Sequence, residues 1–352
     1  QGALGAKVRP VMRLGWNGSD RKQEGPQTVG KNMKFVQGRL SAGRVQSSAL
    51  KIIIERERLR QSFNSALYFD LKAKFSSNSE SFNASLVKID NKRIASGKDF
   101  DPDTGKLKND NVYLLAKSEA EQLVSKLNAG VWKISDIEEK VKKSNPKPPF
   151  TTSTLQQEAA RKLRFSARRT MNNAQNLYRA GFITYMRTDS TNLSAEGVNG
   201  AKAEIVQSFG KEYLPDTPRV YSSKVVNAQE AHEAIRPAGL KFALTESVKS
   251  ELDEDAAKLY DLIRKRTLAS QMKSAKIKQV SVTIINQNSE FRANGQIILF
   301  PGYMAAYVEG TDEANKSKEN KETILPDLAK EQVLQCNDLI SDEHNTKPPA
   351  RF

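Results

Sequence analysis

Thiols and long apolar runs are the scarcest features of this 352-residue sequence. Its single cysteine, Cys336, excludes an internal disulfide and any zinc site that needs several thiolates. No segment approaches the ~20 consecutive apolar residues that a membrane helix requires. The first residues, Gln1-Gly-Ala-Leu-Gly5, lack the apolar core of a signal peptide. These absences predict a protein without a membrane partner that works in the reducing cytoplasm.

Positive charge, by contrast, is in excess. The sequence has 56 Lys and Arg against 41 Asp and Glu, a net charge of +15. A generally basic surface has this composition, and so does a protein that binds a polyanion, because Lys and Arg gain affinity for phosphates by counterion release. The charge favours a nucleic-acid partner but does not distinguish DNA from RNA.

Hydrophobic periodicity divides the sequence into β-rich and helical stretches. Apolar residues alternate with polar ones in 61–147 and again in 277–345, which predicts strands. Between them, residues 148–276 show helical spacing, and the Pro-rich basic stretch Lys142–Pro149 marks the boundary. The economical arrangement is a mixed α and β fold in which one β-rich domain is interrupted by a helical domain.

Local signals predict the ends of two helices in the helical stretch. The cluster Thr151, Thr152 and Ser153 is suited to cap a first helix, and Ser166 a second one after a turn of about three residues, as in a helix-turn-helix unit. Gly181 is suited to end the second of these helices, and a strand is expected from Phe182 to Met186.

Further helices are expected at Ser41–Leu59, at about 118–128 and at about 249–269. Ser118 and Glu121 form a plausible capping box for the second of them, and the acidic cluster Glu251–Asp255 suits a solvated helix start. Apolar side chains recur at helical spacing in the first segment and at alternate positions in the strand after it: Val45, Ala49, Ile52 and Ile53, then Phe69, Leu71, Ala73 and Phe75.

Tyr185 is the residue with the clearest chemical surroundings. In an extended chain, Tyr185, Arg187 and Asp189 project from one face because side chains alternate. A phenol has a pKa of about 10, so its attack on a phosphodiester needs a cation to stabilise the developing charge. Arg187, about 6–7 Å along the chain, can clamp phosphate oxygens, and Asp189 can hold Arg187 in place. The alternative is a half-buried strand tyrosine beside a surface ion pair.

Two other segments offer phosphate contacts. His232 and Arg236 are four residues apart and would share one face of a helix, either as a second phosphate-binding pair or as capping and solvent-facing residues. The small polar loop Ser41–Gln46 precedes a helix, where backbone N–H groups can meet a phosphate, although an ordinary helix entry has the same composition. Basic residues decorate the helix-turn-helix as a DNA-tracking surface or a solvated face: Arg161, Lys162, Arg164, Arg168 and Arg169.

Five blocks of the sequence, in order, resemble the type IA DNA topoisomerases. The block around Tyr185 is similar to the active-site signature of that family and is the most specific of the five. The resemblance covers roughly residues 39–352. The blocks are Leu40–Ser47 with Glu55–Glu57, Pro149–Gln157, Phe182–Ser194, Ala231–Pro237 and Thr346–Phe352.

The resemblance implies a role for each matching residue. Tyr185 would attack one DNA strand and become linked to its 5′ phosphate, Arg187 would stabilise the scissile phosphate, and His232 would assist there. Contacts with single-stranded DNA are implied for a larger set: Ser41, Ala42, Gly43, Arg44, Val45, Gln46, Gln175, Arg187, Asp189 and Arg236.

The resemblance also implies a multidomain arch within a torus. Residues 61–147 with 277–345 would form the β-rich arch, and 148–276 a helical, winged-helix-like domain that carries the tyrosine. Residues 1–60 would belong to a helical base, to which 346–352 begin the return.

The Toprim domain of that family, with its acidic magnesium site, has no counterpart in the sequence. We therefore expect a fragment that lacks the Toprim domain and the C-terminal part. Magnesium ions are expected for the full-length enzyme, with ligands outside this chain, and ATP is not. The implied activity is relaxation of negatively supercoiled DNA by a monomer associated with the nucleoid.

Other functions fit parts of the sequence. Without the metal site, the chain would bind single-stranded DNA without completing catalysis. Other tyrosine transesterases fit less well, because rolling-circle initiators need a His-hydrophobe-His metal site that two isolated histidines cannot form. The Arg and His spacing of tyrosine recombinases is also absent.

Overall fold

The computed structural model describes residues 43–77, 80–221, 233–308 and 324–352. The described helices are α3 (Arg44–Gln61), α4 (Lys117–Asn128), α5 (Thr152–Leu163), α6 (Ala167–Arg179), α7 (Ala195–Ser208), α8 (Thr245–Glu251) and α9 (Glu254–Gln271). The described strands are β1 (Leu67–Ser77), β2 (Glu80–Ile89), β3 (Lys92–Ile94), β4 (Val112–Tyr113), β5 (Trp132–Ser144), β6 (Ala275–Asn286), β7 (Ser289–Phe300) and β8 (Val333–Asn345).

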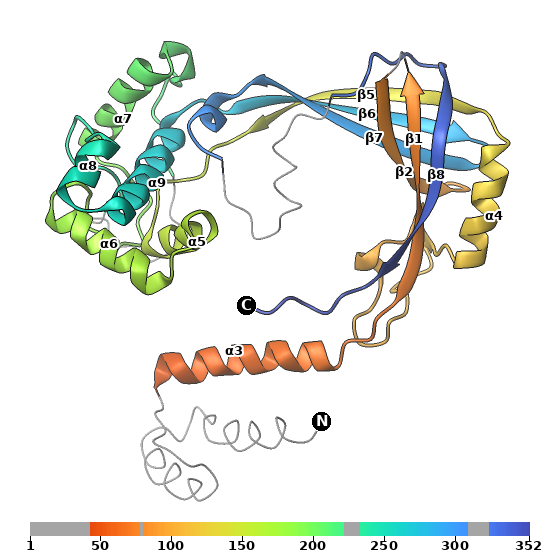
Figure 1. The fold of residues 1–352 in the computed structure, drawn as a ribbon, viewed down its shortest axis with the longest axis horizontal. Coiled ribbons are helices and arrows are strands. Elements are labelled where there is room, and N and C mark those ends of the chain that lie inside the picture. The colour runs from red at the N-terminus through yellow and green to blue at the C-terminus, as the bar shows by residue number, and fades with distance from the viewer. Residues whose placement is uncertain (1–42, 78–79, 222–232, 309–323) are drawn as a thin grey trace, which may run out of the picture.

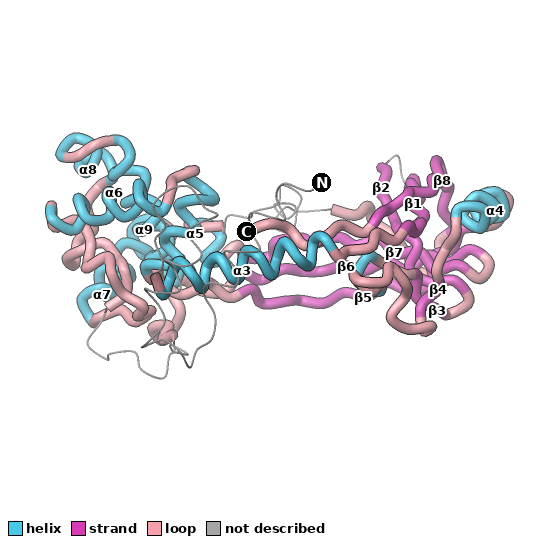
Figure 2. Tube along the Cα trace, turned by 90° about the horizontal axis from the view of Figure 1, so that it is seen from below, coloured by secondary structure: helices cyan, strands magenta, loops and turns pink. Residues whose placement is uncertain are grey.

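Most of the helices lie at one end of the molecule and most of the sheet at the other (Figure 1). Figure 1 shows α5 to α9 gathered at one side, the main body of the sheet at the other, and the long strands β5, β6 and β7 reaching between them. The helix α3 runs from the side of the helical group toward the sheet in both views (Figure 1, Figure 2). The predicted mixed α and β fold is confirmed, whereas the domain boundaries at 147 and 277 stay predictions.

The strands form one sheet in the order β1-β8-β5-β6-β7-β2-β3-β4, and β1 also pairs with β2. Six of the strands therefore form a closed ring. Trp132 packs edge-on against Phe75 and Phe291 in its core, with ring centroids 5.0 and 4.9 Å apart. The alternation predicted for β1 is confirmed, because its alternate apolar side chains are all buried: Phe69, Leu71, Ala73 and Phe75.

The helix α4 covers part of this sheet through buried Ala120 and Leu127. It begins at Lys117, and the side chain of Glu119 accepts a hydrogen bond from the backbone N–H of Ala116 (3.1 Å). The predicted capping box of Ser118 and Glu121 is therefore wrong. The helix starts two residues earlier, so Glu119 takes the position from which a carboxylate reaches back to the first free N–H.

The two N-caps predicted for the helical group are confirmed. Thr151 and Ser166 accept hydrogen bonds from the third residues of their helices, at 3.3 and 3.2 Å. Residues 164–166 join α5 to α6, so the turn between the two helices is as short as expected. The two helices then pack Leu155 and Leu177 into one core with α9.

The helix expected at about 249–269 is two helices. The first, α8, ends at Glu251, and α9 begins after Asp253, whose side chain accepts a hydrogen bond from Ala256 N at 2.7 Å. The acidic cluster is thus a helix start, as predicted, and it interrupts the longer helix because Asp253 offers the backbone a new cap. Twelve residues of α9 are buried.

The helix α3 forms where it was expected, but its apolar residues other than Ile54 are exposed. Only Ile54 is buried, whereas Val45, Ile52 and Ile53 are 81, 51 and 51 % exposed. Near its C-terminal end, the side chain of Arg351 donates to Glu57 (2.7 Å), and Arg56 lies over the ring of Phe352 (4.4 Å). None of the described helices has both the length and the apolar character of a membrane span.

Candidate active site around Tyr185

The segment that carries Tyr185 begins where α6 ends. The backbone N–H of Gly181 donates to Tyr178 O (3.0 Å), and that of Phe182 donates to Leu177 O (2.9 Å). This pair of bonds closes a Schellman motif, and the φ of +77° at Gly181 explains why glycine stands there. The predicted end of the helix is confirmed, and the chain turns sharply toward Tyr185.

Residues before Tyr185 are fixed to the segment 233–238. Thr184 donates its backbone N–H to Arg236 O (2.9 Å) and its hydroxyl to Ala234 O (2.7 Å). Ile183 forms one isolated bridge with Pro237. The strand predicted from Phe182 to Met186 is wrong, because proline donates no hydrogen bond and the pairing does not continue into a ladder.

Residues after Tyr185 are fixed to the start of α5. The hydroxyl of Thr152 donates to Met186 O (2.8 Å) and accepts a hydrogen bond from Thr188 N (2.9 Å). The backbone N–H of Thr152 donates to Thr188 O (2.9 Å). The segment is therefore attached on both sides of Tyr185, which restricts where its backbone can move.

Burial alternates along this segment even though it is not a strand. Tyr185, Arg187 and Asp189 are exposed, and the residues between them, Met186 and Thr188, are buried. The structure thus presents the predicted residues to solvent on alternate positions. No ion pair joins Arg187 to Asp189, and among the described residues neither has any salt-bridge partner, so the expected support of Arg187 by Asp189 is not observed.

The ring of Tyr185 lies against α6. It is 49 % exposed and packs edge-on against the ring of Tyr178, with centroids 5.3 Å apart. Gln175, another predicted DNA contact, lies three residues before Tyr178 and therefore on the same face of α6. Sequence reasoning missed Tyr178, although two tyrosines on either side of a helix-ending glycine are a signal that their rings can meet.

Arg236 is buried, unlike the other candidate phosphate ligands. It is 3 % exposed, and its guanidinium donates to Glu233 (2.6 Å) and to Ser194 Oγ (3.2 Å). Burial raises the pKa of Glu233, but hydrogen bonds from Arg236 and Ser194 outweigh it and the net shift of that pKa is downward. A Cβ at Gly197 would lie 2.5 Å from Arg236 Nε, so α7 approaches this ion pair closely.

His232 lies outside the described residues. The residues that follow it, 233–237, are not helical, so helical spacing does not place His232 and Arg236 on one face. In this structure Arg236 holds the segment that anchors Thr184, and its donors are directed at protein atoms. It supports the position of Tyr185 through the backbone.

The helix start implicated in DNA contact is described only in part. Ser41 and Ala42 lie outside the described residues. Gly43 is the N-cap of α3, has extended backbone and forms no side-chain cap, and Val45 after it is exposed. The four residues Arg44, Val45, Gln46 and Ser47 begin α3 on the side of the helical group (Figure 1).

The basic residues of α5 and α6 are partly used within the chain. Arg169 donates twice to Asp255, at 2.6 and 2.8 Å, and Lys162 lies 3.7 Å from the centroid of the Tyr307 ring. Arg161 pairs with Glu158 at 3.8 Å. Arg164 and Arg168 are exposed. The basic surface expected here is therefore smaller than the sequence suggests.

One cluster among the described residues has the ligands and spacing to hold a metal ion. It consists of Asp70, Asp342 and His344, whose ligand atoms lie within 4.8 Å of one another. The cluster belongs to β1 and β8, at the opposite side of the molecule from α5 and α6 (Figure 1). It is thus separate from Tyr185.

The chain is similar in sequence to known DNA topoisomerases. A family model described as DNA topoisomerase matches residues 14–352. The DNA topoisomerase 1 of Synechocystis sp. is 48% identical over 314 residues, which are 89% of this chain and 35% of that protein. The DNA topoisomerase 1 of Mycolicibacterium smegmatis is 46% identical over 333 residues, 91% of this chain and 36% of that protein.

A solved structure is similar over nearly the whole chain. Full-length topoisomerase I from Thermotoga maritima matches with a TM-score of 0.67 and 30% identity, over 90% of this chain and 47% of that one. The chain spans about a third of the length of the curated relatives it matches.

Proposed function

The chain belongs to the type IA DNA topoisomerase family, and we propose that it carries the strand-cleaving part of such an enzyme, with Tyr185 as the nucleophile. The observation that carries the proposal is the geometry of one segment. Tyr185 is half-exposed, its backbone is attached on both sides, and the exposed Arg187 stands two residues away. A fixed nucleophile beside a cation is what attack on a phosphodiester requires.

The proposed step is a transesterification. The Oη of Tyr185 forms a bond to the phosphorus of one DNA strand while the bond from phosphorus to the 3′ oxygen breaks. The phenol proton ends on the 3′ oxygen, and a 5′-phosphotyrosyl link remains. Because one phosphodiester is exchanged for another, the 3′ hydroxyl reverses the step without ATP. Arg187 neutralises the charge that develops on the non-bridging oxygens.

Magnesium does not fit among the described residues near Tyr185. A magnesium site needs several oxygen ligands, and the segment 182–190 offers the single carboxylate of Asp189. We propose that the magnesium ligands of the complete enzyme are residues outside this sequence. The step of the reaction that uses magnesium is not assigned to any residue of this chain.

DNA contacts follow from the same proposal. Gln175 on α6 and the start of α3 would contact the single strand that leaves Tyr185, and Arg236 would act by holding Thr184. Residues 148–276 would be the tyrosine-bearing domain, 61–147 with 277–345 the arch, and 1–60 with 346–352 parts of the base. Relaxation of supercoiled DNA would be the activity of the complete enzyme.

Covalent trapping of a labelled single-stranded oligonucleotide tests the nucleophile. In the full-length enzyme that contains this sequence, Tyr185→Phe is expected to abolish the adduct. Tyr178→Phe is the matched control, because it loses the same hydroxyl from a ring that is 43 % exposed and touches Tyr185. An adduct that survives in Tyr185→Phe would overturn the assignment.

Substitution of Arg187 tests its role through the rate of cleavage. Arg187→Ala should lower the rate of cleavage by roughly 10²–10³-fold, the usual loss when one group that stabilises the transition state is removed. Arg168→Ala, which removes an exposed arginine of α6, should lower DNA affinity slightly and leave the rate of cleavage of bound DNA unchanged. Equal effects of the two substitutions on that rate would contradict the proposed role.

A second candidate function is binding of single-stranded DNA without cleavage. It is favoured by the fraction of the relatives that the chain spans, about a third of their length. The 352-residue chain would then bind an oligonucleotide with steep salt dependence and form no adduct, with or without magnesium. An adduct formed by this chain would exclude the second candidate.

A further inference from the structure

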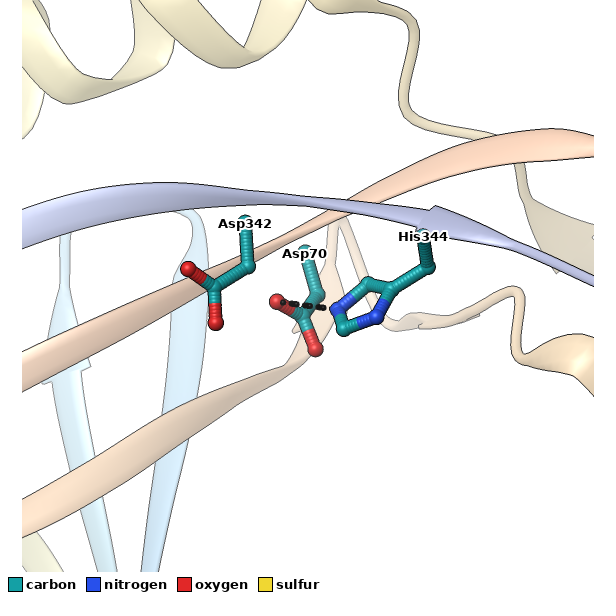
Figure 3. Close-up of side chains that lie close together, drawn as sticks. All are labelled: Asp70, Asp342 and His344. Atoms are coloured by element: carbon teal, nitrogen blue, oxygen red, sulfur yellow. Dashed lines mark ion pairs between the residues drawn. The ribbon is translucent and has the colours of Figure 1, made fainter.

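Figure 3 shows Asp70 and His344 facing one another from neighbouring strands, with Asp342 beside Asp70, and one ligand atom of each residue lies within 4.8 Å of the others. Asp70 of β1 stands directly opposite Asp342 of β8, and His344 stands opposite Tyr68. All three side chains are about a third exposed or less, so the cluster is open to small solutes without being fully hydrated.

The two facing carboxylates of this cluster favour binding of a cation. Like charges directly opposite each other on antiparallel strands are destabilising, and Asp70 and Asp342 have this relation. Lys72 donates to Asp342 Oδ2 and offsets one of the two charges. Asp70 lies beside His344, with Oδ1 and Nε2 3.1 Å apart, and also interacts electrostatically with Lys72.

These two facing atoms are not hydrogen-bonded. Asp70 Oδ1 and His344 Nε2 are both buried, and neither has a hydrogen-bond partner among the described residues. The contact between these two atoms is an ion pair only when the imidazole carries a proton, and without that proton both atoms stay buried with no hydrogen bond, which is costly. One ion that binds both would satisfy both.

The donor set and its spacing fit a transition metal. Imidazole with carboxylates suits zinc and similar divalent ions, whereas magnesium and calcium prefer oxygen ligands alone. Ligand atoms 3.1 Å apart that each lie about 2.1 Å from one ion subtend about 95°, an angle between ideal octahedral and slightly compressed tetrahedral geometry. The ring of Tyr68 stacks on His344 (centroids 5.2 Å apart, 25° between planes), which restricts the imidazole.

We propose that Asp70, Asp342 and His344 bind one divalent transition-metal ion of the zinc class, which joins β1 to β8. Asp342 would use Oδ1, while Lys72 keeps its hydrogen bond to Oδ2 and orients the carboxylate. The ion is structural, since the cluster lies at the far side of the molecule from α6 (Figure 1). The inference does not rest on the proposed function.

The position of the ion gives it a mechanical role. The strands β1 and β8 come from opposite ends of the sequence, and a link that closes so long a loop restricts the unfolded chain strongly. Past β8, Thr346 bonds to Ala66 at 2.9 Å through its backbone, and Arg351 reaches Glu57 of α3. A metal at this point would hold the C-terminal segment beside α3.

Calorimetric titration with zinc chloride tests the site on the 352-residue chain without a histidine tag, in a Cys336→Ser background that removes its one thiol. We expect one ion per chain. Asp70→Asn and His344→Gln each remove a direct ligand and should weaken binding by more than the roughly 10–100-fold that loss of an outer-shell partner costs. Glu343→Gln is the matched control, because Glu343 stands opposite the inward-facing Phe69 and so on the other face of β8.

A second measurement keeps the test independent of folding defects. Zinc should raise the melting temperature of the parent and of Glu343→Gln but not of Asp70→Asn or His344→Gln. Cobalt(II), as a spectroscopic substitute, should give visible absorption that the ligand variants lose. A parent chain that binds no zinc, or ligand variants that bind it as tightly as the control, would overturn the proposal.

Discussion

The helices α3 and α9 are each 18 residues long, yet they differ almost completely in burial. Twelve residues of α9 are buried, whereas α3 buries only Ile54 among its apolar residues. Both carry apolar side chains at helical spacing. The spacing therefore predicts that a helix forms but not that its apolar face is covered.

The surroundings of the two helices explain the difference. Around α9 pack α5, α6, α7 and α8, so each apolar side chain meets a partner. The C-terminal segment 349–352 contacts α3 through Glu57, Arg60 and Arg56. Full burial of an isoleucine side chain stabilises the folded state by about 1.5–3 kcal/mol. The exposed isoleucines of α3 contribute only a small part of this stabilisation.

The largest expected effect comes from one substitution made in both helices. Ile263→Ala in α9 removes a fully buried side chain and should lower the free energy of unfolding of the helical group by about 2–5 kcal/mol. Ile53→Ala in α3, where the side chain is 51 % exposed, should change the free energy of unfolding of the chain by less than about 0.5 kcal/mol. Urea titrations followed by circular dichroism measure both, and equal losses would erase the distinction between the helices.

A smaller effect is expected at the N-caps. Asp253→Ala removes the hydrogen bond to Ala256 N and should cost about 1 kcal/mol, whereas Asp253→Asn should retain most of the stability because asparagine caps equally well. Gly43 gives α3 no side-chain cap, so Gly43→Ser should stabilise that helix by about a few tenths of a kcal/mol. Hydrogen exchange of amides in the first turn of each helix measures the change, and a loss in Asp253→Asn as large as in Asp253→Ala would contradict a capping role.

The smallest effect is the pH dependence of the contact that holds α3. The hydrogen bond from Arg351 lowers the pKa of Glu57 below its ordinary value of 4.5. A lowered folded-state pKa means that the contact is fully present above pH 4.5 and is lost as the pH falls through the lowered value. The NMR signal of Arg351 Nε–H should shift in this acid range, and Glu57→Gln should abolish the shift. A shift that persists in Glu57→Gln would assign the titration to another group.

Elements with local determinants could be predicted from the sequence. The caps at Thr151 and Ser166 and the turn at Gly181 depend on a few neighbouring residues, and the alternation in β1 depends on one strand. The order of the strands could not be predicted from the sequence, because β1 pairs with β8, which lies near the other end of the chain. No local pattern carries that pairing.

The candidate site divides in the same way. Tyr185 and Arg187 could be found because their residue types and spacing are themselves chemical information. The burial of Arg236 and the anchoring by Thr152 could not, since both arise from segments that meet only in the folded chain. The strand expected at 182–186 failed for a related reason: its partner segment contains Pro237 and cannot extend the pairing.

The end of the ribbon formed by β5 and β6 has a consequence for how the molecule can be taken apart. Ser144 is paired with Ala275, so the chain enters and leaves the helical group at neighbouring positions. Residues directly opposite on antiparallel strands have Cα atoms about 4.5–5.5 Å apart, a gap that a two-residue turn can span. The helical group is thus an insertion between two paired antiparallel strands. Replacing this group with a short turn would leave the pairing register of β5 with β6 intact. The residues that follow β7 also pack into the helical group, where Tyr307 is buried and donates to Glu158 (2.8 Å), so β7 gives the domain of Tyr185 a second attachment to the sheet.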